Sequence, residues 1–127
     1  MTLKYKVVKQ AEPGVKGGGE YQYYIRAVER GKVDVEELAR NIASRCTLTH
    51  MDVQMVLLAL AEVIPKMLLD NNSVELGKLG IFSLSLKSDP SPSEEEATWR
   101  KIKGVKVNFR VGKEIQEKVK KTSFKKL

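Results

Sequence analysis

The chain has a single cysteine and a single histidine among its 127 residues, and aromatic side chains make up only 6%. One thiol, Cys46, cannot form an internal disulfide, so nothing ties the protein to an oxidising compartment. No apolar run approaches the roughly 18 residues of a membrane helix, and the first residues lack the apolar stretch of a signal peptide. We therefore expect a cytoplasmic protein with no membrane partner.

The groupings of residues that enzymes use are also missing. His50 has no cysteine, histidine or acidic cluster at ligand spacing, which argues against a metal site. The glycine-rich segment 13–19 is not followed by Gly-Lys-Ser/Thr, so it is no phosphate-binding loop. The run Glu94–Glu96 is expected to be a solvated loop and not a pair of catalytic carboxylates. We predict no enzymatic activity, no metal, no cofactor and no small-molecule substrate.

Positive charge is abundant, and it lies at the two ends of the chain. The net charge is +7. Residues 100–127 hold eleven Lys or Arg against two Glu, residues 1–32 have a balance of +4, and residues 33–99 have a balance of −6. This asymmetry favours a polyanionic partner such as DNA, RNA or an anionic membrane surface. The alternative is that a lysine-rich tail only keeps a small protein soluble.

Two segments near the start of the sequence are typical of strands. Leu3, Tyr5 and Val7 alternate with lysines, and residues 20–28 are rich in aromatic and β-branched side chains. The glycine-rich segment between them predicts a loop. Residues 1–32 are therefore expected to form a β-hairpin that packs on the same domain as the rest of the chain.

Two helices are predicted next, over about residues 34–46 and from residue 49 to about Leu69. Each begins with a capping box, in which the first side chain and one three residues later bond to each other's backbone. The pairs are Asp34 with Glu37 and Thr49 with Asp52. Cys46 falls on the apolar face of the first helix and is expected in the core. The second helix is apolar nearly all the way round, which favours burial in a dimer interface.

The remaining residues predict short strands and a last helix. Residues 74–76 and 81–87 alternate around a tight reversal, and alternation resumes from Trp99 to Phe109. Between them, residues 88–96 consist of serine, aspartate, proline and glutamate, with no apolar side chain besides the two prolines. This composition predicts an exposed excursion. A basic helix is predicted near residues 112–121.

This order of elements resembles the bacterial histone-like HU/integration-host-factor family. The segment Val74–Phe82 is similar to the family's apolar–Gly–apolar–Gly–x–Phe turn, and Phe109–Lys113 is similar to its entry to the last helix. The resemblance implies an α+β fold: two N-terminal helices, an antiparallel sheet with a protruding β-ribbon arm and a short C-terminal helix, in an intertwined homodimer. It further implies that residues 33–127 form the HU-like DNA-binding domain and that residues 1–32 are an N-terminal extension, as in a variant branch of the family.

The resemblance also implies how DNA is bound. In this family two ribbon arms embrace the minor groove, a proline near each tip wedges between base pairs, and basic residues pair with phosphates. The arm corresponds to residues 86–106, with Pro90 or Pro92 at the intercalating tip. The implied DNA-binding residues are Lys87, Arg100, Lys101, Lys103, Lys106, Arg110 and Lys113, the last beside the N–H groups that open the final helix.

The sequence departs from the family at the arm tip. Asp89-Pro90-Ser91-Pro92 and three glutamates stand where the family has Arg-Asn-Pro, and the acidic run would repel phosphates. We therefore expect a histone-like, nucleoid-associated protein of the cytoplasm that binds duplex DNA with low sequence specificity and bends it little. Trp99 is expected either to stack on a base or to pack at the ribbon root.

Two alternatives remain open at this point. One is an HU-like dimer repurposed as a protein-interaction or structural module, and the other is single-stranded RNA binding through Tyr21, Tyr23 and Tyr24. The N-terminal extension would cap the sheet, lengthen the dimer interface or contact DNA through Lys4, Lys6 and Lys9.

Overall fold

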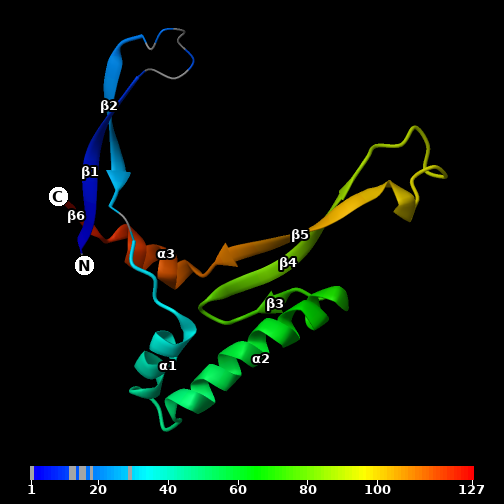
Figure 1. The fold of residues 1–127 in the computed structure, drawn as a ribbon. Coiled ribbons are helices and arrows are strands. Elements are labelled where there is room, and N and C mark those ends of the chain that lie inside the picture. Colours follow the sequence, from blue (N-terminus) through cyan, green and yellow to red (C-terminus); the bar gives the residue numbers. More distant parts are fainter. Residues whose placement is uncertain (1, 12–13, 15–16, 18, 29) are drawn as a thin grey trace. The chain divides into compact units, whose positions relative to one another are not determined.

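A computed structural model describes residues 2–11, 14, 17, 19–28 and 30–127 (Figure 1). The chain divides into two compact units, one made of residues 1–32 with 117–127 and the other of residues 33–116. The described residues form three α-helices and two three-stranded sheets, which confirms the predicted α+β class. Among the helices of the described residues, none is long and apolar enough to cross a membrane.

The first unit contains a sheet in which both ends of the chain take part. Strands β1 (Thr2–Ala11) and β2 (Tyr21–Ala27) form the predicted antiparallel hairpin. A third strand, β6 (Ser123–Lys126), pairs with β1 in parallel, so the strand order is β2-β1-β6 (Figure 1). The sequence predicted no strand at the C-terminal end. The backbone bond from Leu127 N to Tyr5 O, at 2.9 Å, continues this pairing.

The second unit begins with helices α1 (Val35–Ala43) and α2 (His50–Leu69); both begin close to the predicted positions, and α2 also ends where predicted. At α2 the capping box is complete: Asp52 N donates to Thr49 Oγ1 at 3.2 Å and Thr49 N to Asp52 Oδ2 at 3.4 Å. At α1, Asp34 Oδ1 accepts from Glu37 N at 2.9 Å. Each cap satisfies a backbone N–H that has no partner within its helix, which fixes where the helices start.

The prediction for the end of the first helix was wrong. Helix α1 ends at Ala43, where the N–H of Ser44 donates to Arg40 O and the chain enters a run of turns. Cys46 therefore lies beyond the helix and is exposed. The apolar spacing continues to Cys46, but residues 44–48 form the turns that connect α1 to α2, so spacing alone did not mark the end of the helix.

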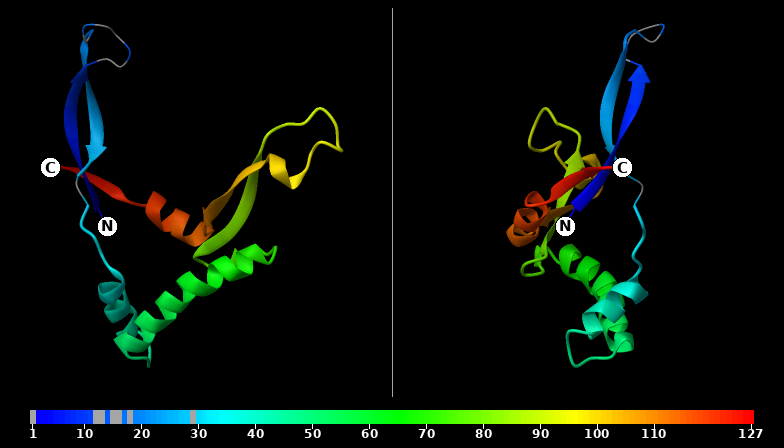
Figure 2. Two further views of the ribbon diagram at one scale, coloured as in Figure 1. Left: turned by 45° about the vertical axis from the view of Figure 1, so that its right-hand side comes forward. Right: turned by 90° about the vertical axis from the view of Figure 1, so that its left-hand side faces the viewer.

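Three antiparallel strands follow, in the order β3-β4-β5 (Figure 1), and Figure 2 shows the last two, yellow-green and orange, side by side. They are β3 (Val74–Glu75), β4 (Gly80–Ser88) and β5 (Ile102–Val111), and the short 3-10 helix η1 (Trp99–Lys101) precedes β5. Helix α3 (Lys113–Lys120) closes the predicted series. Strands β4 and β5 form a two-stranded ribbon that continues beyond β3 to residues 89–98, as the predicted arm required.

Two glycines allow the backbone at the start of β4 and the backbone at the end of β5 to approach each other closely. Gly80 has φ +148°, and a Cβ there would collide with the carbonyl oxygen of Arg110 and the ring of Phe109. Gly112 donates its N–H to Leu79 O at 2.9 Å, and a Cβ there would collide with the carbonyl oxygen of Lys78. The two sequence motifs that carry the family resemblance therefore pack against each other, and only glycine permits this approach.

Substituting Gly112→Ala is expected to lower the stability of the folded protein by about 1–3 kcal/mol, because the backbone of Lys78 must move to admit the methyl group. Gly104→Ala is the matched control, since a Cβ at that position in β5 meets nothing within 4 Å. Denaturant unfolding of both variants measures the difference. Equal stability of the two variants would show that the contact at Gly112 does not hold the ribbon in place.

Much of the apolar surface of the second unit is uncovered in the single chain. Among the described residues only Ala39, Val53 and Leu68 are buried hydrophobics. Along α2, one stripe packs toward the sheet, and a second stripe at helical spacing includes Val56, Val63 and Met67, which are all exposed. A folded protein does not leave so large an apolar area in water, so this helix face requires a covering surface.

Candidate nucleic-acid interface

The β4–β5 ribbon has one polar and basic face. Strand pairing places Ser83 opposite Asn108, Ser85 opposite Lys106 and Lys87 opposite Gly104. Because side chains alternate along a strand, these residues share one side of the ribbon with Arg110. We call this side the polar ribbon face; it contains no acidic residue and comprises Ser83, Ser85, Lys87, Lys106, Asn108 and Arg110 together with Ile81, opposite Arg110, and Gly104.

The opposite side of the ribbon is apolar and is turned toward α2. Phe82, Leu84, Val105 and Val107 line an apolar cavity of about 410 Å³ together with Ala61, Ile64, Pro65, Leu68 and Leu69 of that helix. The rings of Phe82 and Phe109 lie 4.6 Å apart between their centroids. Packing of this side against α2 fixes the polar ribbon face on the side away from the helix.

Neutral hydrogen-bonding groups separate the cations on the polar ribbon face. Asn108 Nδ2 donates to Ser85 Oγ at 3.0 Å, which holds both side chains across the two strands. A depression of about 740 Å³ is lined by Ser83, Asn108 and Arg110, among others. Alternating cations, hydroxyls and amides can bond successive phosphate oxygens without recognising a base.

Near the arm tip, an irregularity in strand pairing changes the setting of Lys103. Lys87 pairs with Gly104, whereas Ser88 pairs with Ile102, so Lys103 has no partner in the ladder. Its Nζ lies 2.8 Å from Asp89 Oδ1. The lysine that the sequence placed among the DNA-binding residues is therefore neutralised by an aspartate of the same arm.

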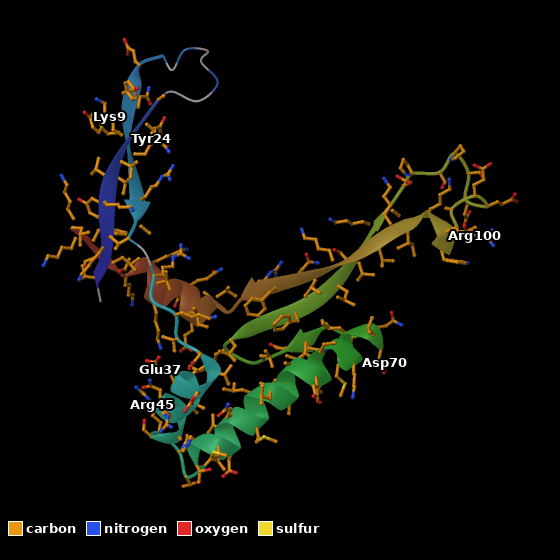
Figure 3. All side chains as sticks on the ribbon, viewed as in Figure 1. Lys9, Tyr24, Glu37, Arg45, Asp70 and Arg100 are labelled. Carbon is orange, nitrogen blue, oxygen red and sulfur yellow. The ribbon has the colours of Figure 1, made fainter. Side chains whose placement is uncertain are left out.

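Arg100 and Lys101 lie in η1, at the far end of the ribbon (Figure 3). The Arg100 guanidinium lies 5.7 Å from the centroid of the Trp99 ring, and Trp99 is 75% exposed. A tryptophan this exposed is not packed at the ribbon root in the single chain. It presents an aromatic face backed by a cation at the tip.

The two prolines of the predicted tip are both exposed, in a loop closed by backbone bonds. Asp89 N donates to Lys101 O at 3.0 Å, and Thr98 N donates to Glu96 O at 2.9 Å. The three exposed glutamates 94–96 follow Pro90 and Pro92 directly in this loop. The structure thus keeps the acidic run beside the prolines.

Lys113 is the first residue of α3, where the sequence placed it, next to Gly112. The following residue, Glu114, forms an ion pair with Lys78 at 3.4 Å. Of the seven predicted cations, the strand register brings together Lys87, Lys106 and Arg110; Arg100, Lys101 and Lys103 lie at the tip. Sequence reasoning missed Ser83, Ser85 and Asn108, although period-two spacing from Arg110 and Lys87 marks them.

Removing the aspartate at the tip is expected to strengthen DNA binding. Asp89→Asn leaves Lys103 free to contact a phosphate and removes one negative charge from the arm, so duplex affinity should rise about two- to fivefold at low salt, with a steeper salt dependence. The exposed Lys103–Asp89 pair adds little to stability, so the melting temperature should change little. Glu75→Gln, on β3, is the control. Unchanged affinity of Asp89→Asn would show that the tip stays away from DNA.

Helices α1 and α2, an antiparallel sheet extended by a ribbon and a closing helix define an HU-like class of protein. A family profile described as "HU domain fused to wHTH, Ig, or Glycine-rich motif" matches residues 1–126, and the chain belongs to this family. The predicted resemblance to HU-like proteins is thereby confirmed.

One similar solved structure is the crystal structure of a protein from Bacteroides vulgatus ATCC 8482, described provisionally as a bacterial DNA-binding protein. It superposes with a TM-score of 0.62 at 14% sequence identity. The match covers 99% of this chain and 48% of that one, so this chain spans about half the length of its structural relative. At this identity the likeness concerns the fold. The comparison with curated proteins finds no match.

Proposed function

We propose that the protein is a non-enzymatic, histone-like protein of the nucleoid that binds duplex DNA with low sequence specificity. The observation that carries the proposal is the polar ribbon face, where Lys87, Lys106 and Arg110 share one side with three neutral hydrogen-bonding residues and no carboxylate. Phosphate contacts of this kind give affinity and orientation but little sequence information. Residues 33–127, including Lys113, supply the interface.

The binding form is a homodimer. The uncovered stripe of α2 that includes Val56, Val63 and Met67 is apolar, so the same stripe of a second copy can pack against it. The exposed apolar area is too large for a stable monomer. A second copy covers this stripe without burying an unpaired charge, because the stripe contains no charged residue. A dimer also doubles the number of phosphate contacts, since each copy presents its own polar ribbon face.

Bending of DNA by the arm tip is weak in this proposal. Pro90 and Pro92 are exposed and able to wedge into a base step, but glutamates 94–96 lie in the same loop and repel phosphates. Arg100 and Lys101 offset part of this repulsion. The tip therefore contacts DNA less closely than the rest of the ribbon.

Duplex titration at several salt concentrations tests the proposed function. With the dimer confirmed by sedimentation, labelled duplex is titrated between about 50 and 200 mM salt, following DNA anisotropy and Trp99 fluorescence. The logarithm of the affinity should fall steeply and linearly with the logarithm of salt, equally for duplexes of unrelated sequence. An intact dimer that fails to bind at about 50 mM salt would instead support the protein-interaction module, which the acidic loop at residues 94–96 favours.

A further inference from the structure

The sheet of the first unit has two chemically different faces. Pairing sets Lys6 opposite Arg26 and Val8 opposite Tyr24 between β1 and β2, and Lys4 opposite Lys125 between β1 and β6. Side chains therefore alternate between two sides of the sheet. One side, the basic sheet face, comprises Thr2, Lys4, Lys6, Val8, Gln10, Gln22, Tyr24, Arg26, Ser123 and Lys125.

The other side, the apolar sheet face, is aromatic and aliphatic. It comprises Leu3, Tyr5, Val7, Lys9, Ala11, Tyr21, Tyr23, Ile25, Ala27, Phe124 and Lys126. Leu3, Tyr5, Ile25 and Phe124 line a depression of about 820 Å³, to which Thr2, Lys4, Ala27, Val28 and Arg30 also contribute. Lys9 belongs to this side, with its Nζ 4.9 Å from the centroid of the Tyr21 ring. Figure 3 shows Lys9 and Tyr24 on the hairpin, and the register places them on opposite faces.

The cations of the basic sheet face are exposed and uncompensated. Strands β1, β2 and β6 contain no aspartate or glutamate, and no ion pair reaches Lys4, Lys6, Arg26 or Lys125 in the part of the chain that the structure describes. Like charges directly opposite each other destabilise a sheet. Two such pairs side by side on one small sheet indicate a surface that is built to meet an anion.

We propose that the basic sheet face is a second duplex-DNA contact surface, separate from the polar ribbon face. The four cations lie on neighbouring strands about 4.8 Å apart and at successive same-side positions about 6.6 Å apart. This density is comparable to that of backbone charge along DNA, where each strand carries one phosphate per 3.4 Å or so of axis. Thr2, Gln10 and Gln22 add neutral groups that can bond phosphate oxygens.

The separation of the two faces favours duplex DNA over other polyanions. Single-stranded nucleic acid is held by aromatic stacking beside cations, and only Tyr24 is aromatic on the basic side, where its hydroxyl bonds to Gln22 Oε1 at 3.4 Å. Membrane-surface binding requires exposed apolar side chains among the cations. Here the exposed apolar side chains, such as Tyr23 and Ile25, lie on the opposite side.

Two matched double variants of the full chain test the proposal. Lys6→Gln with Lys125→Gln removes one cation from β1 and one from β6 on the basic sheet face. Lys9→Gln with Lys126→Gln removes the same number of charges from the same two strands on the apolar sheet face. Labelled duplex is titrated with each variant between about 50 and 200 mM salt.

The basic-face variant should bind duplex more weakly than the unmodified protein at about 0.1 M salt, by about fiftyfold for each chain whose sheet contacts the duplex, because each of the two lost phosphate contacts costs nearly tenfold there. Its salt slope should fall by about two per chain, whereas the apolar-face variant should keep both values. Its melting temperature should equal or exceed that of the unmodified chain, since like-charge repulsion is relieved. Equal losses in the two variants, or no loss in the basic-face variant, would overturn the proposal.

The same assay separates this surface from the ribbon. If Lys106→Gln with Arg110→Gln leaves binding intact while the basic-face variant loses it, the ribbon interface is wrong and the second surface stands. The reverse pattern retains the ribbon and overturns the second surface. Vesicles containing phosphatidylserine provide the other comparison. Tighter binding to them than to duplex, dependent on Lys6 and Lys125, would assign the face to lipid and also overturn the proposal.

Discussion

Reversing the two cations of β5 on the polar ribbon face should weaken duplex binding at least hundredfold at about 0.1 M salt. Lys106→Glu with Arg110→Glu changes the ribbon from a cationic to an anionic surface at the two same-side positions of β5 that flank Asn108. Each reversal removes a phosphate contact and adds a repulsion. Because the face carries no carboxylate at present, nothing already in place masks the change.

The control is Arg45→Glu with Lys66→Glu, which changes the net charge by the same amount and also reverses one arginine and one lysine. Both residues are exposed; Arg45 follows α1 (Figure 3) and Lys66 lies in α2. The control should keep most of the affinity, with a decrease of only a few fold from the lower net charge. A decrease as large in the control as in the ribbon variant would mean that overall charge, and not the polar ribbon face, binds DNA.

Placing a charge on the uncovered stripe of α2 should break the dimer. Val63 is 43% exposed in the single chain, and if the protein were a monomer, Val63→Glu would change stability by less than about 0.5 kcal/mol. In the proposed dimer the same carboxylate would be buried without a partner, which costs on the order of 3 kcal/mol or more. The variant should therefore sediment as a monomer and melt roughly 10 °C lower.

Met55→Glu is the matched control for this prediction. Met55 is 66% exposed on the same helix and lies seven residues before Glu62, so it shares the face that already carries that carboxylate, about 100° round the helix from the stripe. This variant should stay dimeric and retain its melting temperature. The unmodified protein should also melt at higher temperature as its concentration rises, as expected for linked association. A dimeric Val63→Glu variant would place the interface elsewhere.

The helices could be predicted because their signals are local. In each capping pair the two residues are three apart in the sequence, and the apolar residues of α2 continue to Leu69. The end of α1 was predicted less well, because the apolar spacing of its sequence continues past Ala43 into the turns that connect it to α2. Cys46 is exposed for that reason.

Strand β6 could not be predicted from its own residues. Ser123-Phe124-Lys125-Lys126 has one apolar side chain and no alternation, and it becomes a strand only by pairing with β1 from the other end of the chain. Strand formation depends on such context more than helix formation does. The basic sheet face includes Lys125 through this pairing, so sequence alone could not assemble it. The strand pairing also places Lys9 on the opposite face from Lys4 and Lys6, with which the sequence analysis had grouped it.

The candidate interface was predictable in part. The resemblance supplied the seven cations, and alternation along β4 and β5 places three of them on one face with Ser83, Ser85 and Asn108. The setting of Lys103 was not predictable, since it depends on an irregular register between Lys87 and Ser88 that only the paired strands reveal. A change of one residue in register moves a side chain to the other face.

The change in salt slope on neutralising the polar ribbon face is the most direct test of this account. Lys87→Gln, Lys106→Gln and Arg110→Gln together remove three contacts per chain, or six per dimer, so the slope of log affinity against log salt should become shallower by about five. A slope equal to that of the unmodified protein would contradict the account, because it would show that the bound phosphates lie on other residues.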